Sequence, residues 1–236
     1  EDALTSKKKS NGVAYSEERN DVFIFYNGSV AGSSGKKPGA DSGNKFKILW
    51  WNQQGSEDSW DWVTGNNGNF GAQSWPTNAA YFDDSLWYFS GNGNDNMLYQ
   101  LRLAFSDGSS PVVERLYQYD FAGYSNKSGY GDIAIDVERK VLYGSKKNGE
   151  FYWIDLKAVE LARFNAEASG ASGAIPVEDA YQSIKKAIEI PSPDEKKVVT
   201  ASLQLSFDAD YQTLWGQTYG GIYDDDESLY AGAYYL

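Results

Sequence analysis

The stretch that decides the fold is GDIAIDVERKVLYGSKKNGEFYWIDL, residues Gly131–Leu156. It contains a short apolar strand at Gly131–Asp136, a charged turn, and a second apolar strand at Val141–Gly144. A Lys-Asn-Gly turn then leads to a third strand at Glu150–Leu156. Asn-Gly is a common hairpin turn because both residues tolerate positive φ. The stretch therefore predicts three consecutive antiparallel strands.

The same order of strand, turn and strand recurs along the chain, in units that begin near Gly12, Ala79, Asp132 and Ser202. The first two strands of the other units are Gly12–Tyr15 with Val22–Tyr26, Asn78–Phe82 with Leu86–Phe89, and Ala201–Leu205 with Thr213–Gly216. A repeat of this kind is typical of arrays of small antiparallel sheets. We expect a polar N-terminal tail at residues 1–11 and an all-β domain at residues 12–236.

Composition supports this fold class and limits the partners. Aromatic residues make up 16% of the chain and it has 24 Gly, as expected of aromatic strands joined by tight turns. The formal net charge of −12 argues against nucleic acid or an anionic membrane as the main partner, since both attract a basic surface. The sequence holds no run of about 18 apolar residues, so we expect no membrane insertion.

The chain has no Cys and no His. This excludes disulfides, thiolate zinc sites, cysteine nucleophiles, the Ser-His-Asp triad and every histidine metal site. Catalysis would have to rest on carboxylates, Tyr, Lys, Ser or Thr.

Gly131–Leu156 resembles the repeats of YWTD- and NHL-type β-propellers and the blades of gluconolactonase-like proteins. The residues that match their shared pattern are Gly131, Ala134, Ile135, Asp136, Leu142, Tyr143, Gly149, Tyr152, Asp155 and Leu156. The resemblance implies a β-propeller with about four recognisable blade-like units. Leu86–Phe89 and Leu229–Tyr235 also resemble blades of fungal fucose-binding lectins, whose sugar-clamping Arg has no counterpart in those strands.

The sequence leaves the closure of such a propeller open. Four units can close a small ring, because propellers have about four to eight blades, or they can form part of a longer propeller. A β-sandwich of antiparallel hairpins is the structural alternative. Gly28–Asn44 and Leu161–Asp179 are rich in Gly, Ser and Ala and predict surface loops. Val177–Ile190 fits either a short helix followed by a strand or a strand alone.

The candidate ligand site is a region rich in Trp and Asn. Its residues are Trp50, Trp51, Trp60, Trp62, Trp75, Asn66 and Asn67. Flat indole rings stack on sugar C–H groups and amides bond sugar hydroxyls, so this mixture suits a glycan. Trp60 and Trp62 alternate with Asp61, which places both rings on one side of a strand. Packing between neighbouring blades is the alternative role for these tryptophans.

Acidic clusters are the candidate cation sites. Asp224, Asp225, Asp226 and Glu227 form the densest run, and oxygen ligands at short spacing suit calcium. Acidic residues also recur in the turns of each unit, as at Asp83 and Asp84 or Asp208 and Asp210, where capping of the bend is the alternative role. No cofactor is required by the sequence, although calcium is compatible with it.

Three functions agree with these observations. The first is a non-catalytic extracellular or cell-surface module that recognises glycans through aromatic loops. The second is a structural or protein-interaction propeller in an assembly, for which an oligomer is compatible. The third is a carboxylate- or calcium-dependent hydrolase, which would need two acidic side chains close together.

Overall fold

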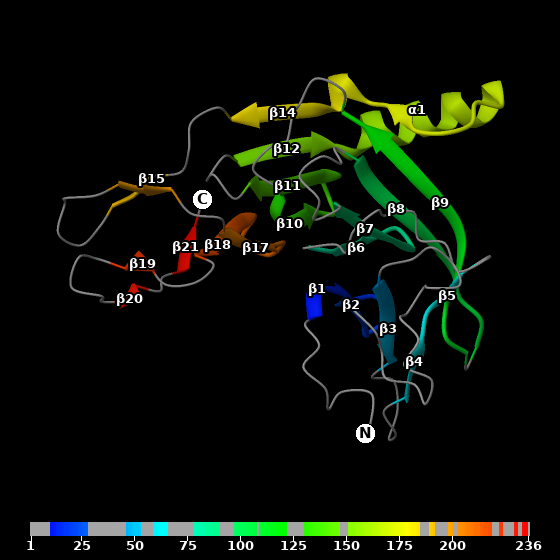
Figure 1. Ribbon diagram of the computed structural model, residues 1–236, viewed down its shortest axis with the longest axis horizontal. Helices are drawn as coiled ribbons and strands as arrows, with labels where there is room; N and C mark the ends of the chain where they lie inside the picture. The colour runs from blue at the N-terminus through cyan, green and yellow to red at the C-terminus, as the bar shows by residue number, and fades with distance from the viewer. Residues whose placement is uncertain are drawn as a thin grey trace. The chain divides into compact units, whose positions relative to one another are not determined.

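The computed structural model describes residues 10–27, 46–52, 59–65, 78–89, 97–107, 109–121, 130–146, 151–184, 189–191, 198–200, 203–218, 222–223, 229–230 and 233–235. The described chain consists mainly of strands in separate antiparallel sheets and contains one α-helix (Figure 1). It divides into two compact units: residues 1–120 with 173–175, and residues 121–172 with 176–236. The predicted all-β class is therefore confirmed, while none of the described sheets closes into a barrel or a propeller ring.

The first sheet of unit 1 is a four-stranded meander. Its strands β1 (Ser10–Ser16), β2 (Asp21–Asn27), β3 (Phe46–Asn52) and β4 (Ser59–Trp62) pair antiparallel in chain order. Side chains alternate between its two faces, so Ala14, Phe23 and Trp50 share the inner face. This face contributes to a hydrophobic core with Leu101 and Val113 of the second sheet.

The second sheet of unit 1 repeats the same meander. Its main strands are β6 (Ala80–Phe82), β7 (Ser85–Phe89), β8 (Met97–Ala104) and β9 (Val112–Asp120), with β5 (Thr64–Gly65) and β13 (Ile175–Pro176) added beside β9. Every side chain of β7 is buried. Because both faces of β7 are covered, Leu86–Phe89 is a continuous apolar run and does not alternate with polar residues.

The third sheet lies in unit 2 and contains the three strands predicted within Gly131–Leu156. Its strands are β10 (Tyr130–Asp136), β11 (Val141–Lys146), β12 (Phe151–Asp155) and β14 (Tyr181–Ile184), and they lie side by side in this order (Figure 1). The three predicted strands are thus present, and the fourth joins after an insertion. The predicted Asn148-Gly149 turn lies outside the described residues.

The insertion corrects one prediction. Leu161–Asp179 was expected to be a surface loop, but α1 (Leu156–Ser169) occupies the first part of it. The helix begins at Asp155, whose side chain accepts a hydrogen bond from the Lys157 N–H, and ends at Gly170 with φ of 67°. After it, η2 (Glu178–Ala180) precedes β14, so the segment forms a short helix followed by a strand.

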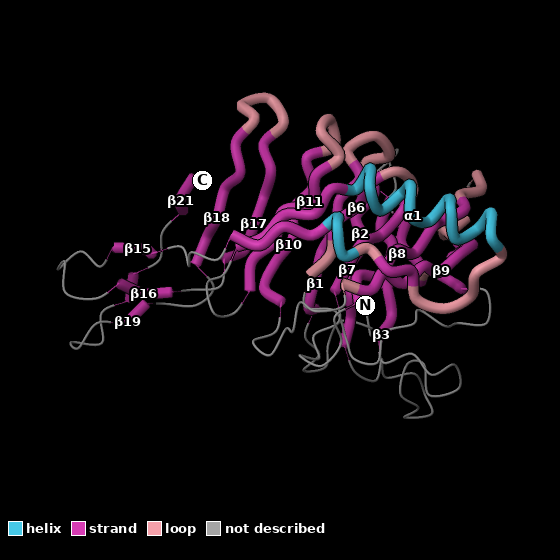
Figure 2. Tube along the Cα trace, turned by 90° about the horizontal axis from the view of Figure 1, so that it is seen from above, coloured by secondary structure: helices cyan, strands magenta, loops and turns pink. Residues whose placement is uncertain are grey.

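The last sheet of unit 2 contains β17 (Leu203–Asp208), β18 (Thr213–Thr218) and β21 (Ala233–Tyr235). Figure 2 shows β17 and β18 as a long hairpin. Two short hairpins accompany it: β15 (Glu189–Pro191) with β16 (Val198–Thr200), and β19 (Ile222–Tyr223) with β20 (Leu229–Tyr230). A strand therefore lies close to each of the four unit starts expected from the sequence.

The turns between the first two strands of these sheets share a backbone conformation. Asn20, Lys140 and Gln212 are each the last turn residue, and their φ angles are 54°, 57° and 52°. The second sheet uses a two-residue turn instead, with φ of 51° at Asp83 and 48° at Asp84. Two consecutive left-handed residues are typical of a type I′ hairpin turn, which matches the strand twist. The turns are therefore local features that the chain repeats.

Neighbouring sheets within each unit also touch through these turns. In unit 1, Arg19 Nε donates to Asp84 Oδ1 (3.1 Å) and to the Tyr81 hydroxyl (3.3 Å). In unit 2, Arg139 Nη1 donates to Gln212 Oε1. Arg19 and Arg139 occupy the same position of their turns, so one type of contact joins the first sheet to the second and the third to the fourth.

Candidate functional site

The outer face of the first sheet carries a group of exposed aromatic side chains. Residues directly opposite in neighbouring strands share a face, and the register pairs Tyr15 with Val22, Val22 with Trp51, and Trp51 with Trp60. Trp62 follows two residues after Trp60 and so joins the same face. We call Tyr15, Trp51, Trp60 and Trp62 the tryptophan face.

The tryptophan face combines exposed rings with one cation. Trp60 is 51% exposed and Tyr15 is 51% exposed, whereas Trp51 and Trp62 are half-buried. Lys47 Nζ lies 5.2 Å from the centroid of the Trp62 ring, within the range of a cation–π contact. The rings thus offer a broad apolar surface with a hydrogen-bond donor beside it, which suits a ligand that has both C–H faces and hydroxyls.

Trp50 lies on the opposite face of the sheet. It pairs with Phe23 and Asp61 and is 8% exposed inside the core. Its indole N–H has no hydrogen-bond partner among the described residues. Trp50 therefore packs in the core, while the side chains of Trp51, Trp60 and Trp62 lie on the face opposite the core.

The remaining predicted site residues cannot be placed on this surface. Trp75, Asn66, Asn67 and the acidic run Asp224, Asp225, Asp226 and Glu227 lie outside the described residues. Within the described ranges, no group of three or more acidic side chains is arranged to hold a metal ion.

The acidic turns use their carboxylates within the protein. Asp136 is completely buried, and its Oδ2 lies 2.8 Å from Arg139 Nη1. In three of the four turns, the last residue of the first strand accepts a hydrogen bond from the backbone N–H three residues later. The side-chain acceptors and the N–H groups they bind are Ser16 Oγ with Arg19, Asp136 Oδ1 with Arg139, and Asp208 Oδ1 with Tyr211. The Asp136 and Asp208 carboxylates therefore hold their turns together, in agreement with the capping alternative, and Ser16 Oγ does the same in the first sheet.

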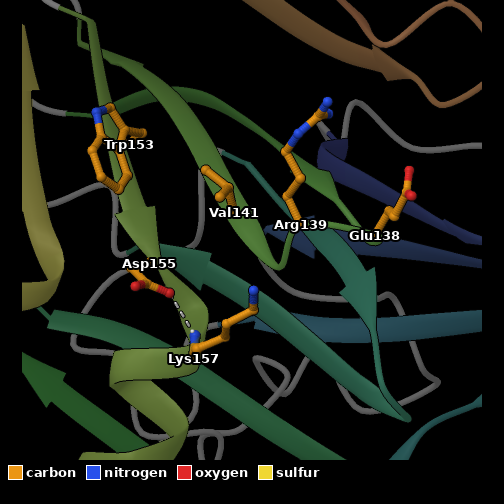
Figure 3. A pocket seen from close by; sticks show the side chains of 6 residues that line it. All are labelled: Glu138, Arg139, Val141, Trp153, Asp155 and Lys157. Carbon is orange, nitrogen blue, oxygen red and sulfur yellow. Dashed lines mark hydrogen bonds between the residues drawn. The ribbon is translucent and has the colours of Figure 1, made fainter.

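A second candidate site is a hollow of about 470 Å³ in unit 2. Its lining consists of Glu138, Arg139, Val141, Trp153, Asp155 and Lys157. Figure 3 shows Val141 near the centre, with Trp153 and Asp155 of β12 on one side and the two turn residues on the other. Lys157 enters from the first turn of α1. The hollow thus surrounds one aromatic ring with two acidic and two basic side chains.

Asp132 is a partly buried carboxylate between two sheets of unit 2. Its Oδ2 accepts a hydrogen bond from the Leu205 N–H of β17 (2.9 Å). Burial outweighs this hydrogen bond and raises the pKa of Asp132 to about 6. Asp132 has a structural contact but no ligand-facing role in the described structure.

Trp153 did not stand out in the sequence, because it lies in a strand that the repeat already explained. Its signal is positional. The register pairs Trp50 with Phe23 in the first sheet and Trp153 with Tyr143 in the third, so the two tryptophans are equivalent. An alignment of β3 with β12 could have identified Trp50 and Trp153 as equivalent positions of two sheets.

No family model matches this sequence, and no curated protein matches it. Among solved structures, the chain is similar to the computationally designed Ika4 protein, with 10% identity, a TM-score of 0.40, and coverage of 99% of this chain and 94% of that one. It is also similar to a plant albumin from Cicer arietinum showing hemagglutination, with 10% identity, a TM-score of 0.41, and coverage of 96% and 92%. In the described part of the chain, no helix has the length and apolarity to cross a bilayer. Likenesses at these TM-scores do not assign the chain to a family.

Proposed function

We propose that this protein is a non-catalytic carbohydrate-binding module, exposed outside the cell or on its surface, that holds glycans on the tryptophan face. The observation that carries the proposal is the placement of Trp51, Trp60 and Trp62 on one face of a single sheet, opposite the core. Three indoles on neighbouring strand positions make a surface wide enough for several sugar rings. Because the rings lie on adjacent strands of one sheet, an extended polysaccharide suits this face better than a compact ligand.

We also propose that the four sheets are blades of a β-propeller. Three features support this: the meander order of the sheets, the repeated turns with one left-handed residue, and the equivalent contacts of Arg19 and Arg139. An experimental structure with the four sheets around one axis is the expected result. Two separate sandwiches, one for each unit, would contradict the propeller and favour the alternative fold.

The carbohydrate proposal is tested by adsorption to insoluble cellulose, chitin and β-glucan. Trp60→Ala is expected to weaken adsorption about tenfold or more, since exposed aromatic anchors carry much of the energy of a binding surface. Trp215→Ala removes another exposed tryptophan, 42% exposed on β18, and is the matched control that should adsorb normally. Equal adsorption of both variants and the unchanged protein, or no adsorption at all, would overturn the proposal.

A protein partner is the second candidate for the same face. In the third sheet, the residues equivalent to Val22 and Trp51 are Leu142 and Ile154, and both are completely buried. This kind of face therefore packs on protein elsewhere in the chain. If the first sheet docks a second copy, light scattering will show a mass that rises with concentration, and Trp60→Ala will abolish the rise. A monomer at all concentrations would exclude self-association.

A further inference from the structure

The hollow beside Trp153 exists because one position of the repeat is covered in unit 1 and uncovered in unit 2. Trp50 sits in the core with Leu103 and Val113, and its exposed fraction is 8%. The equivalent Trp153 is half-buried and lines a hollow of about 470 Å³. That volume falls within the roughly 300–1,000 Å³ of typical ligand pockets. Core packing thus accounts for Trp50, but it does not account for an indole at the equivalent position Trp153, where the ring lines a hollow.

The polar groups at the hollow differ in how much of their bonding capacity is already used. Arg139 is held by Asp136 and Gln212, and Glu138 Oε2 accepts from Gln212 Nε2 (3.2 Å). Asp155 Oδ1 accepts from the Lys157 N–H (2.9 Å), a contact drawn in Figure 3. Among the described residues, Asp155 Oδ2 has no donor and the Lys157 ammonium has no acceptor.

The groups with unused capacity therefore include one aromatic ring, one carboxylate oxygen each of Asp155 and Glu138, and the Lys157 ammonium. The ring offers a surface for C–H groups, the carboxylate oxygens accept from hydroxyls, and the ammonium donates to hydroxyl oxygens. The charges of the lining cancel, because Glu138 and Asp155 oppose Arg139 and Lys157. A lining without net charge favours a neutral polyhydroxylated ligand over an anion or a cation.

We infer that this hollow is a second carbohydrate site, which takes one or two terminal residues of a neutral glycan. Trp153 stacks on the sugar ring, Asp155 Oδ2 accepts from a hydroxyl pair, and Lys157 Nζ donates to a neighbouring hydroxyl oxygen. The inference rests on the proposed function in that both sites bind carbohydrate. It differs in ligand shape, because a hollow holds a chain end while the tryptophan face holds an extended surface.

The experiment uses the full chain and soluble cellobiose, maltose and lactose, followed by saturation-transfer-difference NMR and calorimetry. At least one disaccharide is expected to bind, and Trp153→Ala is expected to weaken its binding about tenfold, because the aromatic anchor is removed. Asp155→Asn should weaken it severalfold while the helix stays capped, since Asn caps as well as Asp. Trp215→Ala is the control that should bind unchanged, and circular dichroism checks that each variant is folded.

The outcomes separate this inference from the proposed function. Loss of disaccharide binding in Trp153→Ala but not in Trp60→Ala supports the hollow as an independent site. Disaccharide binding that depends on Trp60 and not on Trp153, or polysaccharide adsorption without any disaccharide binding, overturns the inference and leaves the proposed function standing. Tighter binding of glucuronic acid than of the neutral sugars would also overturn it, because the lining would then act as an anion site.

Discussion

At the scale of single residues, Asp132 couples folding to pH. Its carboxylate is partly buried against β17, and its pKa in the folded chain is about 6, compared with an ordinary value of 3.8. The folded state therefore holds this proton more tightly than the unfolded state does. Between pH 4 and pH 6 the folded chain binds more protons, so the contribution of Asp132 to stability is largest below pH 4 and decreases as pH rises to 6.

Replacement by asparagine tests this coupling. Asp132→Asn keeps an acceptor for the Leu205 N–H but cannot ionise. We expect its unfolding free energy, relative to the unchanged protein, to be higher at pH 7.5 than at pH 4 by roughly 1–3 kcal/mol. Urea unfolding at both pH values measures the difference. A difference in unfolding free energy that is the same at both pH values would contradict the raised pKa of Asp132.

Gly144 is a second position where one residue decides local packing. It lies opposite Tyr152 in the register of β11 and β12, and a Cβ at Gly144 would lie 2.1 Å from Tyr152 Cζ. Tyr152 is completely buried, so its ring cannot move away without disturbing the core. The absence of a side chain at Gly144 thus makes room for the ring.

Gly144→Ala is expected to lower the unfolding free energy by about 1–3 kcal/mol, the usual cost of overpacking. In a Tyr152→Leu background the same change should cost much less, because Leu lacks the ring atoms that the Cβ meets. A double-mutant cycle by urea unfolding measures the coupling. Equal costs in both backgrounds would place the effect in the backbone rather than in the ring.

At the scale of elements, strands were predictable where the local pattern and the turn chemistry agreed. β10 and β11 alternate or run apolar and are joined by a turn that Asp136 caps. The sequence did not predict α1, because only Leu156 and Val159 of the helix are buried and the following segment is rich in Gly, Ser and Ala. A helix with so short an apolar stripe leaves a weak periodic signal.

The candidate site was predictable only in part for a related reason. The sequence placed Trp60 and Trp62 on one face, and the register agrees with this. It could not separate Trp50 from Trp51, because adjacent residues of a strand face opposite sides and the choice of inner side depends on pairing with β2. Pairing is a tertiary property that no local pattern contains.

The end of α1 gives a prediction at this scale. Gly170 has φ of 67°, and its N–H and that of Ala171 bond the carbonyls of Glu167 and Ala166. A Cβ at Gly170 would meet no atom within 4 Å, so only backbone strain opposes a side chain there. Gly170→Ala is expected to lower the unfolding free energy by about 1 kcal/mol.

Urea unfolding of Gly170→Ala, with exposed Ser172→Ala as the control, measures this cost. The control should change the unfolding free energy by less than about 0.5 kcal/mol, as is usual for surface positions. A loss in the control as large as that in Gly170→Ala would mean that the segment, rather than the left-handed conformation, is sensitive.

At the scale of the whole molecule, charge works against folding. The 33 acidic and 21 basic residues leave a formal net charge of −12, and compact states concentrate this charge. We expect the thermal midpoint to rise when NaCl is increased from 10 to 300 mM at pH 7.5, because salt screens the repulsion. Glycerol without salt serves as a solvent control. A midpoint that falls with salt would show that ion pairs such as Arg19–Asp84 outweigh the repulsion.

The insertion between β12 and β14 has a consequence for synthesis. The third sheet is continuous as far as Asp155, but its fourth strand begins only at Tyr181, after α1 and η2. Once β12 has left the ribosome, and while Tyr181–Ile184 is still enclosed in the exit tunnel, the nascent sheet presents the outer edge of β12 with its backbone N–H and C=O groups unpaired. Translation therefore passes through an interval in which strands from other nascent chains compete for this edge.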